Sequence, residues 1–281
     1  MLLQRIVTAV VLLGLLLPTL WLSIEWPFLA FTLLLLAAAG WEWGRLNGYG
    51  MAASLAGGAL VAAGCVLGWM VGWTRAAPAA LWWVATACWV LGGAWALKAG
   101  PSGWPRLPRT LRWLFGIGAL WVAWMALASA KSWGLVFLVS TLCVVWVADI
   151  GAYFGGRRFG RRKLAPTISP GKSWEGVYSG AIGVLLMAGI WLTVELQGER
   201  VGASLFGLLW QQAGTVLGTL MLLALVGMSV VGDLVESLVK RAAGAKDSSR
   251  LLPGHGGVLD RVDALLPTLP VAMAFGHWGV S

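Results

Sequence analysis

Long uninterrupted apolar runs restrict what this chain can fold into more than any other feature. The stretch from Ile6 to Leu22 holds 17 uncharged residues, and similar runs recur along the chain. A helix needs about 20 apolar residues to cross the hydrocarbon core of a bilayer. Only 11% of the residues are charged, against about 25% in a soluble domain, and 59% are hydrophobic. The sequence therefore predicts an all-α polytopic integral membrane protein.

Nine membrane-spanning helices are expected from apolar runs bounded by glycine, proline or charge. Their ranges are 6–22, 26–40, 52–73, 79–97, 111–128, 134–150, 176–195, 214–232 and 264–280. The first range could be read as a signal peptide. Its apolar run exceeds the usual length, however, and no small-x-small cleavage pattern follows before Glu25. We therefore keep it as a span.

The positive charges divide unequally between the two sides that nine spans define. Seventeen of the 20 Lys and Arg residues fall on the side of the N-terminus, and Arg75, Lys131 and Arg200 fall on the other. Loops rich in Lys and Arg stay in the cytoplasm. We therefore expect an inner (plasma) membrane protein with a cytoplasmic N-terminus and an external C-terminus. The net charge of +9 then reflects topology, and nucleic acid is not an expected partner.

Cysteine usage excludes three further classes of chemistry. Cys65, Cys88 and Cys143 all lie inside apolar runs, there is no CxxC pair, and the chain has two histidines. Disulfide bonds, zinc sites and thiol catalysis are therefore not expected.

Two long polar segments, 149–175 and 233–263, carry the candidate chemistry on the cytoplasmic side. We accordingly divide the chain into an N-terminal region, 1–130, for packing, lipid contact and dimerisation, and a C-terminal catalytic region, 131–281.

The first polar segment begins at Asp149, at the end of an apolar helix. An acid in such a position usually faces a cavity or a partner. A run of five basic residues between Arg157 and Lys163 follows, which suits either a topology signal or contact with anionic lipid. The GKS sequence that includes Lys172 and Ser173 is not a P-loop, because the first glycine of that motif is replaced by Pro166. Ser173 instead suits a helix N-cap, with or without phosphate binding beside Lys172.

The second polar segment continues the helix that precedes it. At helical spacing Asp233, Ser237, Lys240 and Arg241 share one face, although an amphipathic turn with a Glu236–Lys240 pair would explain the same pattern.

Two further acids follow a His-Gly-Gly sequence in this segment. Asp260 and Asp263 lie three residues apart and would repel each other without a cation, which favours Mg²⁺ or a similar hard ion. Acids favoured at a helix N-terminus are the alternative. Gly256 and Gly257, beside His255, would let backbone N–H groups approach a phosphate.

The stretch from Ser237 to Asp263 reads SLVKRAAGAKDSSRLLPGHGGVLDRVD. It resembles the signature S-x2-K-R-x4-K-D-x7-H-G-G-x2-D-R-x-D of the phosphatidate cytidylyltransferase family, also called CDP-diacylglycerol synthases. The earlier stretch ADIGAYFGGRRFGRRKLAPTISPGKSWEG is similar to the family's other cytoplasmic segment, where Thr is common at the position of Ser173. The resemblance implies that CTP and phosphatidate give CDP-diacylglycerol and pyrophosphate, with one Mg²⁺ or Mg²⁺ and a second cation, in a homodimer.

The resemblance also implies roles for individual residues. Catalytic roles fall to Asp233, Lys246, Asp247, Asp260 and Asp263, of which Asp233, Asp260 and Asp263 would hold the metal. Substrate contacts fall to Asp149, Tyr153, Lys172, Ser173, Ser237, Lys240, Arg241, His255, Gly256, Gly257 and Arg261.

Two other functions fit the polytopic architecture. A CTP-dependent lipid kinase would transfer the γ-phosphoryl group and leave CDP free. An ion or anion transporter would explain acids in membrane helices, but it would place polar residues near the bilayer midplane. Here the polar residues gather at one end of the helices.

Overall fold

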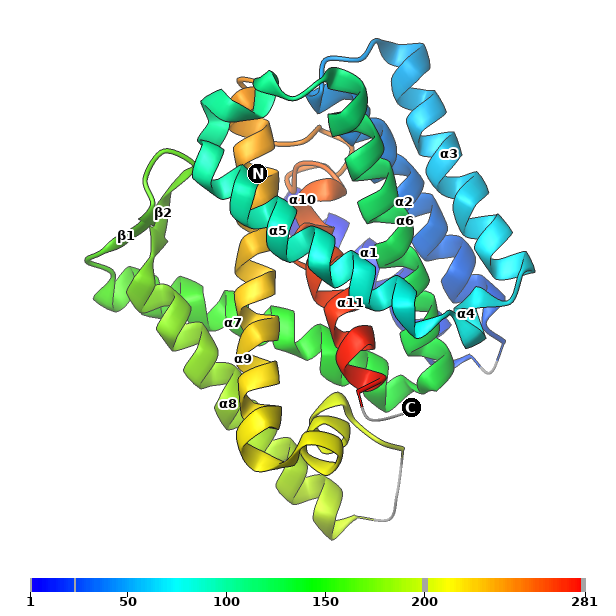
Figure 1. The fold of residues 1–281 in the computed structure, drawn as a ribbon, viewed down its shortest axis with the longest axis vertical. Coiled ribbons are helices and arrows are strands. Elements are labelled where there is room, and N and C mark those ends of the chain that lie inside the picture. Colours follow the sequence, from blue (N-terminus) through cyan, green and yellow to red (C-terminus); the bar gives the residue numbers. More distant parts are fainter. Residues whose placement is uncertain (1, 23, 199–201, 279–281) are drawn as a thin grey trace.

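The computed structural model describes residues 2–22, 24–198 and 202–278. Helices dominate it, with one small antiparallel hairpin at the edge of the bundle (Figure 1). The elements are α1 (Leu2–Trp21), α2 (Trp26–Leu46), α3 (Met51–Met70), α4 (Trp73–Ala76), α5 (Ala79–Gly103), the 3-10 helix η1 (Trp104–Arg106), α6 (Arg109–Trp133), α7 (Leu135–Phe159), β1 (Lys163–Ala165), β2 (Ser169–Ser173), α8 (Trp174–Gln197), α9 (Leu205–Ala242), α10 (Leu259–Val262) and α11 (Leu265–Gly276).

Seven of the described helices are long and apolar enough to cross a membrane, namely α2, α3, α5, α6, α7, α8 and α9. This confirms the all-α, multi-pass architecture. The apolar part of α1, Val10–Trp21, is shorter. The 12 residues of α11 rise about 18 Å, which is less than the roughly 30 Å of the hydrocarbon core. The count of nine spans and the orientation of the termini stay predictions.

Helix α7 is longer than the sequence indicated. The expected span ended at residue 150, whereas the helix continues to Phe159 and carries Asp149, Tyr153 and Arg157 on successive turns. Glycines explain the extension, because α7 and α8 pack closely along them. A Cβ atom on Gly155 would collide with Ser179, and one on Gly151 would lie 2.9 Å from the Cα atom of Gly180. Small residues at a helix interface allow such close packing of backbones in membranes.

The hairpin β1–β2 joins α7 to α8 and was not expected from the sequence. Its strands pair antiparallel, with Lys163 opposite Ser173 and Ala165 opposite Ser169. Ser173 then caps α8, since its hydroxyl accepts a hydrogen bond from Gly176 N at 3.2 Å. This confirms the predicted N-cap. The hairpin thus brings Lys172 back over the end of the helix pair.

Helix α9 and the segments after it complete the bundle. A break at Gly214, where φ is +72°, bends α9 near its start, and the helix then continues to Ala242, as the sequence indicated. Residues 243–258 form a loop before the short α10. Helix α11 packs against α5, α6, α7 and α9 in the interior of the bundle (Figure 1). Ten of its 12 residues are buried, so the second half of the chain interleaves with the first.

Candidate functional site

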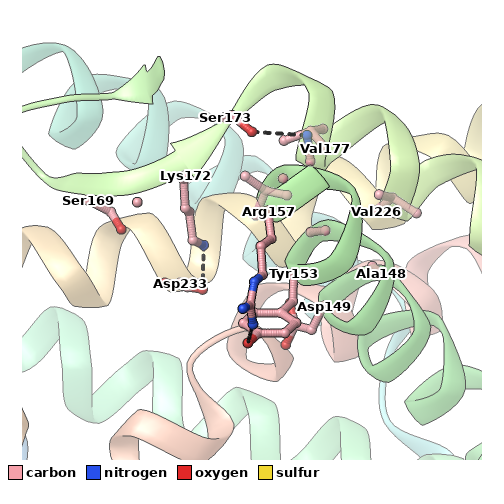
Figure 2. A pocket seen from close by; sticks show the side chains of 16 residues that line it. Ala148, Asp149, Tyr153, Arg157, Ser169, Lys172, Ser173, Val177, Val226 and Asp233 are labelled. Atoms are coloured by element: carbon pink, nitrogen blue, oxygen red, sulfur yellow. Dashed lines mark hydrogen bonds and ion pairs between the residues drawn. The ribbon is translucent and has the colours of Figure 1, made fainter. Parts of the chain in front are cut away.

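A cavity of about 540 Å³ lies between α7, α8, β2 and α9. Its lining combines charged and apolar side chains from segments far apart in the sequence (Figure 2). The wall is formed by Ala148, Asp149, Ala152, Tyr153, Gly156, Arg157, Ser169, Gly171, Lys172, Ser173, Gly176, Val177, Gly180, Val226, Val230 and Asp233. The structure therefore brings together five of the residues that the sequence predicted for the site, Asp149, Tyr153, Lys172, Ser173 and Asp233.

The charged part of the cavity centres on an ion pair between Lys172 on β2 and Asp233 on α9 (Figure 2). Beside it, Arg157 donates a hydrogen bond from Nη1 to the hydroxyl of Tyr153 at 3.2 Å. The valines of α8 and α9 form the apolar part. The cavity therefore suits a ligand that has both an anionic group and a hydrocarbon part.

The side chains on the predicted face of α9 have different partners. The hydroxyl of Ser237 donates to Asp233 Oδ1 at 3.3 Å. Arg241 donates to the backbone carbonyls of Ile168, at 3.4 Å, and Ala245, at 3.0 Å. Arg241 therefore holds the hairpin turn and the start of the following loop in place.

Lys240 is largely buried between two carboxylates. Its Nζ lies 2.5 Å from Glu236 Oε2 and 2.6 Å from Asp260 Oδ1, and 11% of the side chain is exposed. The expected Glu236–Lys240 pair is confirmed, and a second acid joins it. This arrangement makes Lys240 a link between α9 and α10.

Asp260 accepts hydrogen bonds at both of its oxygens. Its Oδ2 accepts from Ser248 N at 2.9 Å, Ser248 Oγ at 2.8 Å and Gly257 N at 2.8 Å, while Oδ1 accepts from Lys240. Burial would raise the pKa of Asp260, but the hydrogen bonds from Lys240, Gly257 and Ser248 outweigh it and lower the pKa to about 2. The Gly257 N–H group thus binds a carboxylate of the chain itself.

Asp263 lies between α10 and α11, and its Oδ1 accepts a hydrogen bond from Ala264 N at 2.8 Å. Desolvation raises the pKa of Asp263, and the negative charge of Asp233 raises it further. The two carboxylates therefore lie near enough to repel each other.

The His-Gly-Gly sequence forms a tight turn before α10. Gly256 has a φ of +86°, a conformation that favours glycine. Arg261 donates from Nη2 to the carbonyl of His255 at 2.7 Å, which closes the turn. The Nδ1 atom of His255 is buried without a hydrogen-bond partner among the described residues.

Lys246 and Asp247 do not line the cavity that holds Lys172. They line a second, more open cavity of about 640 Å³, together with Arg45, Arg250 and other residues of α2 and the loop. The structure thus separates these two predicted catalytic residues from the main cavity.

Two residues near these sites were not predicted as site residues from the sequence, and only the structure shows their positions. Arg157 belonged to the basic run in the sequence, and its cavity position follows from the extended α7. Glu42, on α2, is completely buried and binds the loop before α10. The sequence held one indication of it, since Glu42 is the only acid in the apolar run of α2.

The predicted metal ligands fit Mg²⁺ in chemistry, because carboxylate oxygens are its preferred protein ligands. The mutual repulsion of Asp233 and Asp263 is what a bound cation would relieve. Within the described ranges, however, no three His, Cys, Asp or Glu side chains are already grouped to hold a metal ion. Asp260 in particular is turned toward Lys240 and Ser248.

Comparison with known proteins gives a consistent result. The sequence model described as the cytidylyltransferase family matches residues 3–278. A protein of Pseudomonas aeruginosa named phosphatidate cytidylyltransferase is 40% identical over 288 residues, which cover 99% of each chain. A Haemophilus influenzae protein of the same name is 48% identical over 141 residues, 49% of this chain and 44% of that protein. These similarities confirm the resemblance carried by the two polar segments.

Proposed function

Because the chain belongs to the cytidylyltransferase family, we propose that it transfers the cytidylyl group of CTP to phosphatidate. The products are CDP-diacylglycerol, which serves phospholipid biosynthesis, and pyrophosphate. The observation that carries this function is the full-length similarity to a phosphatidate cytidylyltransferase. The cavity supports it, because a lipid phosphate needs charged and apolar surfaces side by side.

The phosphate of phosphatidate fits the charged part of the cavity, where Lys172 and Arg157 lie. The acyl chains fit along Val177, Val226 and Val230, on the walls that α8 and α9 contribute. The exposed rings of Tyr153 and Phe154 lie beside this region on α7. Tyrosine side chains are enriched at the level of lipid head groups.

The reaction itself needs little help from a general base. An anionic oxygen of phosphatidate attacks the α-phosphorus of CTP, and the bond from that phosphorus to the pyrophosphate oxygen breaks. The main barrier is repulsion between two polyanions, which positive side chains held in place reduce. Lys172 and Arg157 would bind and orient the phosphates.

We extend this proposal to the metal. Asp233, Asp260 and Asp263 would hold Mg²⁺, alone or with a second cation, because all three supply hard oxygen ligands and Asp233, which lies near Asp263, pairs with the phosphate-binding Lys172. Bound Mg²⁺ supplies positive charge that offsets the charge of the phosphates. Lys240 would keep Asp260 oriented through its ion pair.

We also propose that the site faces the cytoplasm in the inner membrane. The support is the charge distribution, because 17 of the 20 Lys and Arg residues lie on one side of the nine expected spans. The homodimer implied by the family resemblance stays a prediction that light scattering of the purified protein in detergent can measure.

The test of this function uses CTP labelled with ³²P at the α-phosphate and purified protein in detergent. We expect label in a chloroform-soluble product only when phosphatidate and Mg²⁺ are both present. Asp233→Asn should abolish the transfer, whereas Glu25→Gln, at an exposed ion pair with Arg75, should not change it. Folded protein that gives no lipid-bound α-label would contradict the proposal. Transfer of γ-label would then indicate a lipid kinase, and ion flux in vesicles a transporter.

A further inference from the structure

Glu42 is a fully buried carboxylate in the middle of the polar network before α10. It belongs to α2 and is 0% exposed. Its hydrogen-bond partners lie 206 to 217 residues later in the chain. Oε1 accepts from Ser249 Oγ at 2.5 Å and Val258 N at 3.0 Å, Oε2 accepts from Leu259 N at 2.7 Å, and Ser248 Oγ lies 3.1 Å from Oε2.

This pattern requires a carboxylate. Both oxygens of Glu42 accept hydrogen bonds from a backbone N–H group, of Val258 and of Leu259, and Oε1 also accepts from Ser249. The single hydroxyl proton of Ser248 is shared between Glu42 and Asp260. A glutamine has the same shape, but its NH₂ group would face a hydroxyl and a backbone N–H group. One amide donor at least would then lose its acceptor.

Glu42 and Asp260 share one partner. Ser248 Oγ lies 3.1 Å from Glu42 Oε2 and 2.8 Å from Asp260 Oδ2. Leu259, whose amide donates to Glu42, directly precedes Asp260 in α10. The position of the Asp260 carboxylate is therefore fixed from both sides, by Lys240 of α9 and by the loop that Glu42 holds.

The glycine of the turn supports the same conclusion independently. A Cβ atom on Gly257 would collide with Oε1 of Glu42 and with Oγ of Ser248. The backbone of the His-Gly-Gly turn therefore lies directly against the Glu42 carboxylate, and any larger residue at this position would push the two apart.

We propose that Glu42 is a positioning residue of the transferase. Through the loop 248–259 it sets the place of Asp260, and it thereby couples the N-terminal helices to the phosphate and metal end of the site. Only the kinetic part of this inference rests on the proposed function, because the contact between Glu42 and the loop 248–259 can be measured without substrates.

The first experiment compares Glu42→Gln with Glu195→Gln. Glu195 is the matched control, since its carboxylate also binds a residue later in the chain, the α9 N-cap Ser204, accepting from Ser204 N at 3.1 Å and Ser204 Oγ at 2.5 Å. It lies about 30 Å from Ser173 along α8. In protein without Mg²⁺ or substrates, we expect Glu42→Gln to speed hydrogen exchange of the amides in 248–260 at least tenfold. Glu195→Gln should leave those amides unchanged.

The kinetic arm measures the Mg²⁺ concentration that gives half-maximal activity. We expect Glu42→Gln to raise it about tenfold and to leave the KM for phosphatidate within about twofold of the wild type. A mere loss of folded protein would lower the maximal rate and change neither quantity. Ser249→Ala removes one hydrogen bond and keeps the charge, so it should give a smaller shift in the same direction if Glu42→Gln does not fold.

The proposal is overturned if exchange in 248–260 and the Mg²⁺ requirement both stay at wild-type values in the folded variant. It is also overturned if Glu195→Gln changes them equally. A wild-type protein that lacks transferase activity would refute the proposed function, while the exchange experiment would still decide whether Glu42 holds the loop.

Discussion

Lys172 of the β1–β2 hairpin and Asp233 of α9 form an ion pair across the charged part of the main cavity. Their side chains keep 28% and 27% of their surface exposed, so an incoming phosphate has access to the ammonium group. The pair thus holds the hairpin over the cavity and keeps a positive charge close to an acid of the predicted metal site.

Replacing Lys172 by Met should lower cytidylyl transfer about 10²- to 10³-fold, the range observed when one stabilising donor is removed from an active site. Lys172→Arg should keep part of the activity because it keeps the charge. Lys163→Met is the control, since Lys163 lies on β1 of the same hairpin and is exposed. Equal activity of Lys172→Met and wild type would show that Lys172 does not contribute to cytidylyl transfer.

Gly155→Ala should destabilise the protein, because the added methyl group would collide with Ser179 where α7 and α8 pack. Overpacking of this kind costs about 1–3 kcal/mol. Gly189→Ala on α8 has no atom within 4 Å of its new Cβ and should be neutral or stabilising. Thermal unfolding in detergent measures both, and equal midpoints would contradict the close packing.

Lys240→Met should destabilise the fold by about 3–5 kcal/mol, because it leaves two buried carboxylates without their cation. Adding Glu236→Gln to that variant should recover part of the loss, since one of the two charges is then removed. Unfolding midpoints of the single and double variants test this. A double variant less stable than Lys240→Met would argue against the pairing.

The Mg²⁺ requirement should rise as the pH falls. Desolvation and the charge of Asp233 raise the pKa of Asp263, so this carboxyl group keeps its proton to a higher pH than usual. Protons then compete with the cation for the ligand. We expect the half-maximal Mg²⁺ concentration to increase between about pH 9 and about pH 7. An unchanged requirement over that range would exclude Asp263 as a ligand.

Much of the architecture was predictable because apolar runs of sufficient length have few alternatives to helices in a membrane. The N-cap at Ser173 and the continuation of α9 to Ala242 also followed from local patterns. The length of α7 did not, because the apolar run ends at residue 150 and the residues after it are rich in glycine and charge. Gly151 and Gly155 are tolerated inside the helix because α8 packs closely against them.

The site was only partly predictable, because the sequence does not show which polar residues from distant segments come into contact. The grouping of Asp149, Lys172 and Asp233 was expected, but the separation of Lys246 from them depends on the path of a loop. The role of Glu42 depends on a contact between α2 and a segment more than 200 residues away. Such a contact leaves no local pattern in the sequence.

The buried position of α11 has a consequence for how the protein is made. A 12-residue helix that contains Pro270 is too short to settle across a bilayer alone, and its surface is covered by α5, α6, α7 and α9. It must enter a slot that the earlier helices have already formed. Asp263 directly precedes α11 and accepts a hydrogen bond from Ala264 N, so the place of this carboxylate depends on how α11 is seated among the other helices.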